Sequence, residues 1–284
     1  MLTPSIVTDA VTRALAEDAP WGDISVTASI PPTMQFQANL VAREPGRFAG
    51  GPVLVETFRQ VDPCITVSQL VDEGTEFPAG AVLASVTGPA AGILTAERVA
   101  LNFVQRLSGI ATLTAQFVGE VIRVGASARI ADTRKTTPGL RALEKHAVTA
   151  GGGINHRFSL SDAVMLKDNH LAALGATSGT GLTEAIMQVK SRVGHTTSII
   201  VEVDELSQVE PVLAAGVTGV LLDNFSLADL RAGVELIAGS CVAEASGGVT
   251  LDTVAEIAQT GVDIIAVGAV THGAAALDLG LDAA

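Results

Sequence analysis

Six short apolar runs in the second half of the chain, each followed by a segment with helical spacing, constrain the fold most. They are ARIAD (128–132), AVMLK (163–167), IIVEV (199–203), GVLLD (219–223), CVAEA (241–245) and IIAVG (264–268). Continuous β-branched strands that alternate with helices predict an α/β fold whose parallel sheet is covered on both faces. Most of the runs end at or next to a charged or small residue, so polar groups should gather at one edge of this sheet.

The regular spacing of these runs favours a barrel built from βα units, in which chemistry lies at the carboxyl ends of the strands. Six clear strands fall short of eight, so we expect an incomplete or seven-stranded barrel rather than a full one. An open doubly wound sheet is the alternative, because it also binds ligands at its strand ends.

The first hundred residues indicate a separate domain of mixed structure. Their spacing predicts an amphipathic helix over 5–17, extended segments over 35–43 and 65–71, and a long helix over 94–122, where the pattern changes. A chain of 284 residues is long enough for a barrel and a companion domain.

Composition narrows the classes of function. The net charge of −13, a single Trp and no Tyr disfavour nucleic acid as a partner, since phosphate backbones would be repelled and stacking platforms are lacking. Cys64 and Cys241 fall in apolar stretches without a disulfide or metal spacing, which predicts buried thiols. No segment approaches the roughly 18 unbroken apolar residues of a membrane span, so we expect a cytoplasmic protein without a membrane partner.

Cations are concentrated in one stretch of this acidic chain. Seven of its 17 Lys and Arg residues, but only three acidic residues, lie between Arg129 and Lys167. Taken one at a time, Arg134, Lys135, Arg157 and Lys167 could be solvated surface charges. Together with His156 they follow predicted strands or a glycine turn on one rim, which favours a ligand with more than one anionic group.

Two glycine turns and two carboxylates complete the pattern. Ser246-Gly247-Gly248 leads into a helix predicted to begin near Thr250, and Gly268-Ala269 follows the last strand, as expected for phosphate binding by backbone amides. Glu202 and Asp223 end successive strands and could bind Mg²⁺, ribose hydroxyls or developing positive charge, or could form salt bridges with the nearby cations. The residues thus suggest an anionic small molecule, a phosphorylated sugar and Mg²⁺.

These motifs together resemble those of the quinolinate phosphoribosyltransferases, the nicotinate-nucleotide pyrophosphorylases of NAD synthesis. The resemblance spans nearly the whole chain and is carried by EDAPWGDIS (17–25), LTAERVALNFVQRLSGIAT (94–112), DTRKTTPGLRALEKHAV (132–148), GGGINHR (151–157), LKDNH (166–170), VEVD (201–204), LLDN (221–224), EASGG (244–248) and VGAVTH (267–272). One departure is Ala-Pro-Trp before Gly22, where glycine-rich versions are common.

The resemblance implies an amino-terminal α/β sandwich domain over 1–108, joined by the tail 271–284, and an open seven-stranded α/β barrel over 109–270. It also implies a homodimer with shared active sites, or a higher oligomer. Arg98 would reach the partner's substrate, and the residues around quinolinate and diphosphate would be Thr133, Arg134, Lys135, His156, Arg157 and Lys167. Glu202 and Asp223 would lie at the ribose and hold Mg²⁺ through waters, and the 5-phosphate would be bound by Ser246, Gly247, Gly248, Val267, Gly268 and Ala269. Asp168, Asn169 and His170 would support the Lys167 loop.

The implied reaction transfers phosphoribose from 5-phosphoribosyl 1-diphosphate to quinolinate with loss of CO₂, and Lys135, Lys167, Glu202 and Asp223 would be its catalytic residues. Three alternatives stay open. They are a related phosphoribosyltransferase with another acceptor (nicotinate, or that of the molybdenum-transport-associated homologues), a Schiff-base aldolase that uses Lys135 or Lys167, and a noncatalytic phosphosugar sensor. The number of cations favours a dicarboxylate acceptor over a monocarboxylate.

Overall fold

The computed structural model describes residues 2–284, which divide into two compact units. Unit 1 contains the chain up to Ala115, Thr136–Gly152 and Val270–Ala284, and unit 2 contains Gln116–Lys135 and Gly153–Ala269. The segment Thr136–Gly152, which lies within the range 109–270 that the resemblance implies for the barrel domain, belongs to unit 1. A buried ion pair between Arg106 and Glu144 is one reason.

Unit 1 is an α/β sandwich. Its main sheet has the antiparallel order β12 (Leu279–Ala283), β1 (Gln35–Ala42), β5 (Val82–Pro89) and β3 (Thr66–Ser68), and β2 (Gly46–Arg47) pairs with β4 (Glu76–Phe77). Its helices are α1 (Pro4–Asp18), α2 (Ile24–Ser29), α3 (Gly51–Val61), α5 (Arg141–Ala150) and the first part of α4 (Ala90–Arg123). The helices and extended segments predicted in this part of the sequence are confirmed.

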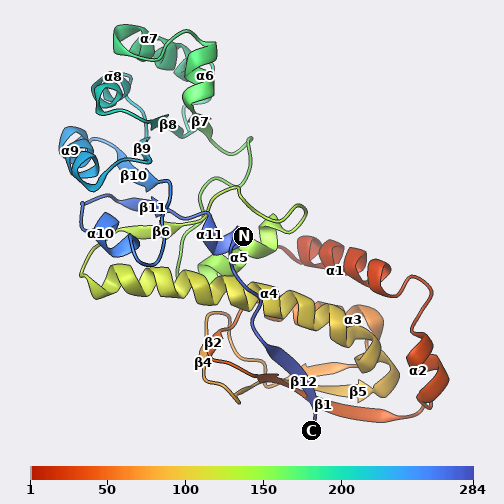
Figure 1. The fold of residues 1–284 in the computed structure, drawn as a ribbon. Helices are drawn as coiled ribbons and strands as arrows, with labels where there is room; N and C mark the ends of the chain where they lie inside the picture. Colours follow the sequence, from red (N-terminus) through yellow and green to blue (C-terminus); the bar gives the residue numbers. More distant parts are fainter. Residues whose placement is uncertain (1) are drawn as a thin grey trace. The chain divides into compact units, whose positions relative to one another are not determined.

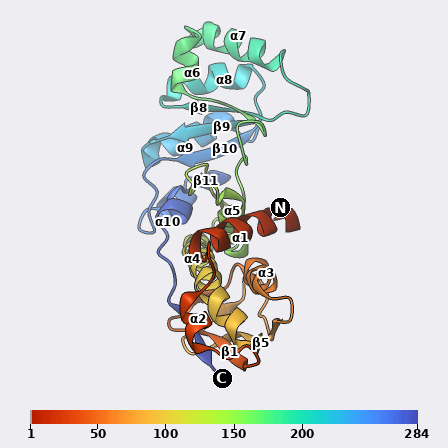
Figure 2. The same cartoon turned by 90° about the vertical axis from the view of Figure 1, so that its right-hand side faces the viewer.

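The core of unit 1 lies between this sheet and its helices. Alternate residues of β1, namely Ala38, Leu40 and Ala42, are buried, as the twofold period of a strand requires. The carboxyl-terminal strand β12 runs beside β1, with Leu40 opposite Leu281 (Figure 1). Helix α1 packs on α3 (Figure 2), where the Thr8 hydroxyl donates to Glu56.

Unit 2 contains all six predicted strands in one parallel sheet. They are β6 (Arg129–Ala131), β7 (Val164–Leu166), β8 (Ile199–Val203), β9 (Gly219–Asp223), β10 (Val242–Ser246) and β11 (Ile264–Ala266), in the order β6-β11-β10-β9-β8-β7. The first strand pairs with the last, as in a barrel, whereas a doubly wound sheet has its first strands in the middle. The doubly wound alternative is therefore wrong.

A seventh strand is reduced to a single bridge. Ala131 pairs with Ile154, whose N–H donates to Ile130 O at 2.8 Å and whose O accepts from Asp132 N at 3.1 Å. The unit is thus an α/β sheet of six strands plus one bridged residue, with β7 at the opposite edge from β6.

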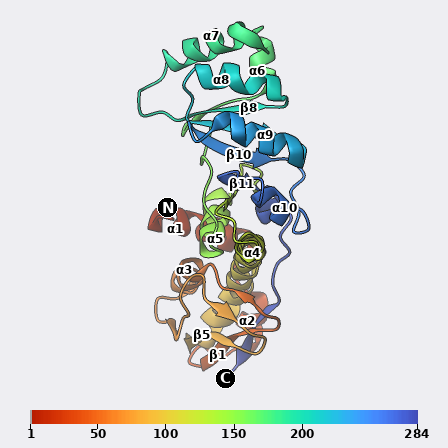
Figure 3. The same ribbon diagram turned by 90° about the vertical axis from the view of Figure 1, so that its left-hand side faces the viewer.

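Helices follow the strands of unit 2. They are α6 (Asp168–Ala173), α7 (Gly179–Lys190), α8 (Val209–Ala214) after the short 3₁₀ turn η1 (Leu206–Gln208), α9 (Leu227–Ile237) and α10 (Val254–Ala258). Of these, α8, α9 and α10 lie beside β8, β9, β10 and β11 (Figures 1 and 3). The short helix α11 (Ala269–His272) begins at the last residue of unit 2 and continues in unit 1.

The helix predicted to begin near Thr250 is present, with its first regular residue at Val254 after a turn in which Thr250 O accepts from Val254 N at 3.0 Å. Thr250 N also donates to the Thr253 hydroxyl at 3.0 Å, a bond that satisfies an amide at the start of this turn.

Two expectations from composition can be compared with the structure. No helix among residues 2–284 combines the length and the apolar character that a membrane crossing needs. The prediction of buried thiols is wrong, since Cys64 is exposed in the turn after α3 and Cys241 is half-buried. Burial still raises the pKa of the Cys241 thiol.

Two glycines of α4 give a test of this packing. A Cβ at Gly109 would lie 1.9 Å from Ala275 O, whereas a Cβ at Gly119 would meet nothing within 4 Å. We expect Gly109→Ala to lower the free energy of unfolding by about 2 kcal/mol or more, because backbone must move. The control Gly119→Ala should raise it by about 0.5–1 kcal/mol, because alanine favours helix. Chemical denaturation measures both, and equal effects would contradict the close approach of the carboxyl-terminal segment to α4.

Candidate active site

A cavity of about 360 Å³ in unit 2 lies where the strands of the sheet end. Its lining comprises Thr133, Arg134, Lys135, His156, Arg157, Met165, Lys167, Glu202, Leu221, Asp223, Glu244, Ser246 and Ala266. Where one strand contributes two lining residues, they are two positions apart, as are Leu221 and Asp223 of β9, so their side chains share a face. Register explains their convergence, because Glu202 and Glu244 both pair with Leu221 in the parallel ladder.

The four cationic side chains and the imidazole that the sequence placed on this rim line this one cavity; they are Arg134, Lys135, Arg157, Lys167 and His156. Arg157 is held by a bond from Nη1 to Ala163 O of 3.0 Å. Partial burial and the nearby Arg134 charge both lower the pKa of Arg157. The charged form of Arg157 is thus destabilised in this cavity, and a bound anion would offset this cost.

Glu202 and Lys167 form an ion pair across the ends of β8 and β7. The Glu202 side chain is only 14% exposed, whereas Lys167 is 44% exposed. The salt bridge considered as an alternative for Glu202 therefore exists, and it fixes the carboxylate inside the cavity. His170 Nδ1 accepts a hydrogen bond from Lys167 N at 3.1 Å, which supports the start of α6.

A buried acid that sequence reasoning left without a role lies beside the cations. Glu244 is 2% exposed, and its Oε1 is 3.3 Å from His156 Nε2. His156 Nδ1 accepts from Arg157 N at 2.6 Å, and His156 N donates to the buried Asp132 carboxylate at 2.8 Å. These bonds orient the imidazole. The alternation along CVAEA was the signal that could have placed Glu244 inside, since it shares a face with Ser246.

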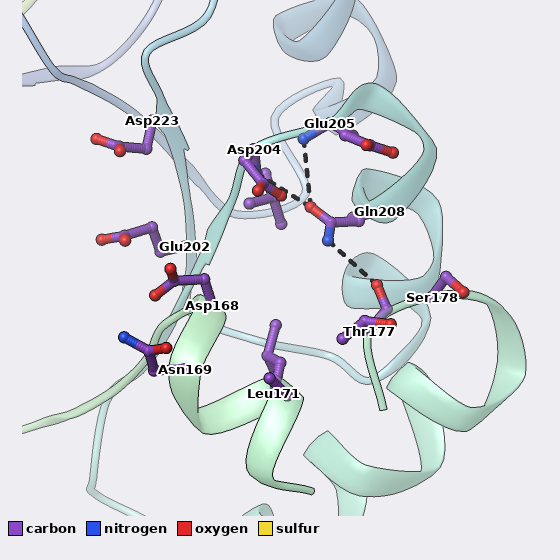
Figure 4. A pocket seen from close by; sticks show the side chains of 12 residues that line it. Asp168, Asn169, Leu171, Thr177, Ser178, Glu202, Asp204, Glu205, Gln208 and Asp223 are labelled. Atoms are coloured by element: carbon purple, nitrogen blue, oxygen red, sulfur yellow. Dashed lines mark hydrogen bonds between the residues drawn. The ribbon is translucent and has the colours of Figure 1, made fainter. Parts of the chain in front are cut away.

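A second cavity, of about 490 Å³, adjoins the same two strands and is lined by Asp168, Asn169, Leu171, Ala172, Thr177, Ser178, Glu202, Val203, Asp204, Glu205, Gln208 and Asp223. Figure 4 shows Glu202 and Asp223 pointing the same way, with Asp168 next to Glu202. Gln208 fixes one wall by accepting from Asp204 N at 3.0 Å and donating to Thr177 O at 3.1 Å. Glu202 and Asp223 thus line both a cation-rich and an acid-rich cavity.

The first predicted phosphate loop, Ser246-Gly247-Gly248, depends on glycine at its second residue. Gly247 has φ +96°, and a Cβ there would lie 2.2 Å from Asn224 Oδ1 and 2.9 Å from Asn224 N. This close approach joins the loop to the residue after Asp223, whose Oδ2 accepts from Asn224 Nδ2 at 2.7 Å. Ser246 lines the cation-rich cavity.

The second predicted phosphate loop, Val267-Gly268-Ala269, directly follows β11. Val267 N donates to Ala131 O at 2.8 Å, so this amide is already used in the sheet. Gly268 and Ala269 are half-buried. Arg98 is not among the residues that line these cavities; it is an exposed residue of α4 in unit 1.

Comparisons with known proteins find relatives of this chain over nearly its whole length. The family models described as the N-terminal and C-terminal domains of quinolinate phosphoribosyl transferase match residues 23–108 and 110–282. A nicotinate-nucleotide pyrophosphorylase, named as carboxylating, from Mycobacterium leprae is 41% identical and covers 96% of each chain. A mitochondrial quinolinate phosphoribosyltransferase from Nicotiana tabacum, named as decarboxylating, is 41% identical over 94% of this chain and 79% of its own.

A solved structure extends the similarity to three dimensions. NadC from Streptococcus pyogenes superposes with a TM-score of 0.93 at 38% identity, covering 99% of this chain and 97% of its own. The matches to both domain models, to full-length relatives and to this structure agree with one another. The chain therefore belongs to the quinolinate phosphoribosyltransferase family.

Proposed function

We propose that this protein transfers phosphoribose from 5-phosphoribosyl 1-diphosphate to quinolinate with decarboxylation, giving nicotinate mononucleotide, diphosphate and CO₂ in de novo NAD synthesis. Family membership supports the reaction class. The observation that carries the proposal is the cavity where Arg134, Lys135, Arg157 and Lys167 share a lining with Glu202 and Asp223. The compartment that we propose is the cytoplasm.

Quinolinate fits the charge of the cation-rich cavity. Burial and the neighbouring Arg134 charge lower the pKa of Arg157, so an added carboxylate would stabilise its charged form. Two carboxylates on one pyridine ring can engage two cations at once, whereas nicotinate offers only one. In this proposal Thr133, Lys135 and His156 complete the contacts to quinolinate and to the leaving diphosphate.

The acid-rich side of the site suits the sugar. The pyridine nitrogen would form a bond to C1 of the ribose while the C1–O bond breaks and diphosphate leaves with the electron pair. Positive charge develops on the ribose ring during this step, and the carboxylates of Glu202 and Asp223 would stabilise it. Their position between two cavities allows contact with the ring while the cations face the diphosphate.

Decarboxylation follows from the new cationic nitrogen. When the C2 carboxylate leaves as CO₂, the electron pair stays on C2 beside that nitrogen, and C2 then takes up a proton. Lys135 and Lys167 are the proposed donors, because both line the cavity. Ser246, Gly247, Gly248, Gly268 and Ala269 are proposed to hold the 5-phosphate, and Val267 would contribute through its place in the loop rather than through its amide.

The carboxylates also fit Mg²⁺, which prefers oxygen ligands and retains several waters. No group of three or more His, Cys, Asp or Glu among residues 2–284 could hold an ion by itself. Glu202 and Asp223 are therefore proposed to bind the ion through waters, together with substrate oxygens. Bound there, Mg²⁺ would neutralise charge on the diphosphate.

The activity itself is the first test. Purified protein with quinolinate, 5-phosphoribosyl 1-diphosphate and Mg²⁺ should release equal amounts of nicotinate mononucleotide, diphosphate and CO₂. Nicotinate in place of quinolinate should react at least about tenfold less efficiently, since one charged contact is lost. Equal or better use of nicotinate would contradict the proposed acceptor, and ligand binding without diphosphate release would contradict catalysis.

A matched pair of arginines tests the cavity. Arg157→Ala should raise KM for quinolinate about 30-fold, which corresponds to about 2 kcal/mol for a lost charged contact. Arg129→Ala is the control, because Arg129 belongs to the same cation-rich stretch but is exposed at the start of β6 and is not in the lining. Steady-state kinetics measures both, and similar KM values for the two variants would remove Arg157 from the site.

We also propose a homodimer in which exposed Arg98 completes the site of the partner subunit. Arg98→Ala and Glu202→Ala should each be inactive alone. After mixed refolding they should recover about a quarter of wild-type activity, because half of the dimers are mixed and each has one intact site. Verified mixed dimers without activity would rule out sharing.

A further inference from the structure

A buried ion pair in unit 1 joins three segments of the chain. Glu144 on α5 is fully buried, and its Oε1 accepts from Arg106 Nε at 3.2 Å and Nη2 at 2.9 Å. The same carboxylate accepts from the Thr137 hydroxyl at 2.7 Å and from Thr137 N at 3.0 Å. Four hydrogen bonds satisfy a charge that would otherwise be costly to bury.

Arg106 extends the network to the carboxyl-terminal segment. Its Nη1 donates to Ala274 O at 2.7 Å, and its Nη2 donates to Thr271 O at 2.5 Å. The guanidinium side chain is 25% exposed, and Thr271 is fully buried. The planar Arg106 guanidinium donates to one carboxylate and two carbonyl oxygens in fixed directions. A lysine ammonium would not hold three acceptors in such a defined geometry.

Thr137 and Thr271, at the two ends of this network, lie just after the points where the chain passes from unit 2 into unit 1. The chain passes from unit 2 into unit 1 after Lys135 and again after Ala269. Thr137 lies two residues beyond Lys135, and Thr271 lies two residues beyond Ala269. One ion pair therefore anchors both segments that follow the proposed substrate-binding loops, the cationic Arg134-Lys135 and the phosphate loop Gly268-Ala269.

Stability alone gives a weak reason for such a pair, because a buried ion pair often contributes no more than apolar residues of the same volume. Precise placement of the binding groups is a stronger reason for keeping this ion pair. A displacement of a binding group by about 1 Å can lower the rate about 100-fold. We propose that Arg106 and Glu144 are positioning residues of the phosphoribosyl transfer, which set the placement of the two loops without touching substrate. This inference rests on the function proposed above.

Variants of Thr137 separate positioning from folding, since the ion pair itself is left intact. Thr137→Val removes the hydroxyl that donates to Glu144 and keeps the shape, and Thr137→Ser keeps the hydroxyl. Thr149→Val is the control, because the Thr149 hydroxyl donates to His146 O on exposed α5 surface. We expect kcat/KM for quinolinate to fall about tenfold in Thr137→Val, and to stay within about twofold of wild type in Thr137→Ser and Thr149→Val.

Glu144→Gln tests the pair directly and should lower kcat/KM for both substrates by more than about tenfold. Leu54→Ala, a substitution in the sandwich core at a residue only 1% exposed, supplies a destabilised comparison that should keep wild-type kinetic constants below its unfolding temperature. All assays are run well below the unfolding midpoint of each variant.

Wild-type constants in folded Thr137→Val would overturn the inference. The inference would also be overturned if the activity lost by Glu144→Gln were no larger than the fraction of that variant that is unfolded. If Glu144→Gln does not fold, the comparison of Thr137→Val with Thr137→Ser still decides. A wild-type protein that fails to turn over quinolinate is a different outcome, because it overturns the proposed function before any variant is compared.

Discussion

Parallel pairing in register is the constraint on which the rest of the structure depends. Because Glu202 and Glu244 both lie opposite Leu221, alternate side chains of neighbouring strands must enter the same volume. A charge at such a position cannot turn to solvent without losing the register, so it needs a partner. Lys167 supplies one for Glu202, and His156 lies beside Glu244. In the proposed function, an anionic ligand would stabilise the charges of Arg134 and Arg157.

The chain shows which parts of such an architecture a sequence can predict. Continuous apolar runs predicted all six strands of unit 2, and their polar ends predicted most of the cavity lining, because both depend on neighbours in sequence. Ile154 forms only one bridge, which leaves no periodicity to detect. The place of Thr136–Gly152 in unit 1 involves the contact of Glu144 with Arg106, residues far apart in sequence. The alternation along CVAEA could have placed Glu244 on an inward face, but its position beside His156 depends on how distant segments meet, which no local pattern reveals.

The proposed chemistry follows from a division of charge. Cations gather in one cavity and carboxylates in the other, and Glu202 and Asp223 border both. An acceptor with two negative groups and a sugar that becomes positive in the transition state match this division. The ion pair of Arg106 and Glu144 adds a positioning role to these binding groups, because it anchors the segments that continue from both proposed loops.

A crystal structure with quinolinate and an unreactive analogue of 5-phosphoribosyl 1-diphosphate tests the central claim most directly. The account predicts the pyridine ring in the cavity of unit 2, its carboxylates in contact with Arg134 or Arg157, and its nitrogen facing C1 of a ribose that lies beside Glu202 and Asp223. Quinolinate bound elsewhere, with these side chains in contact with neither ligand, would contradict it.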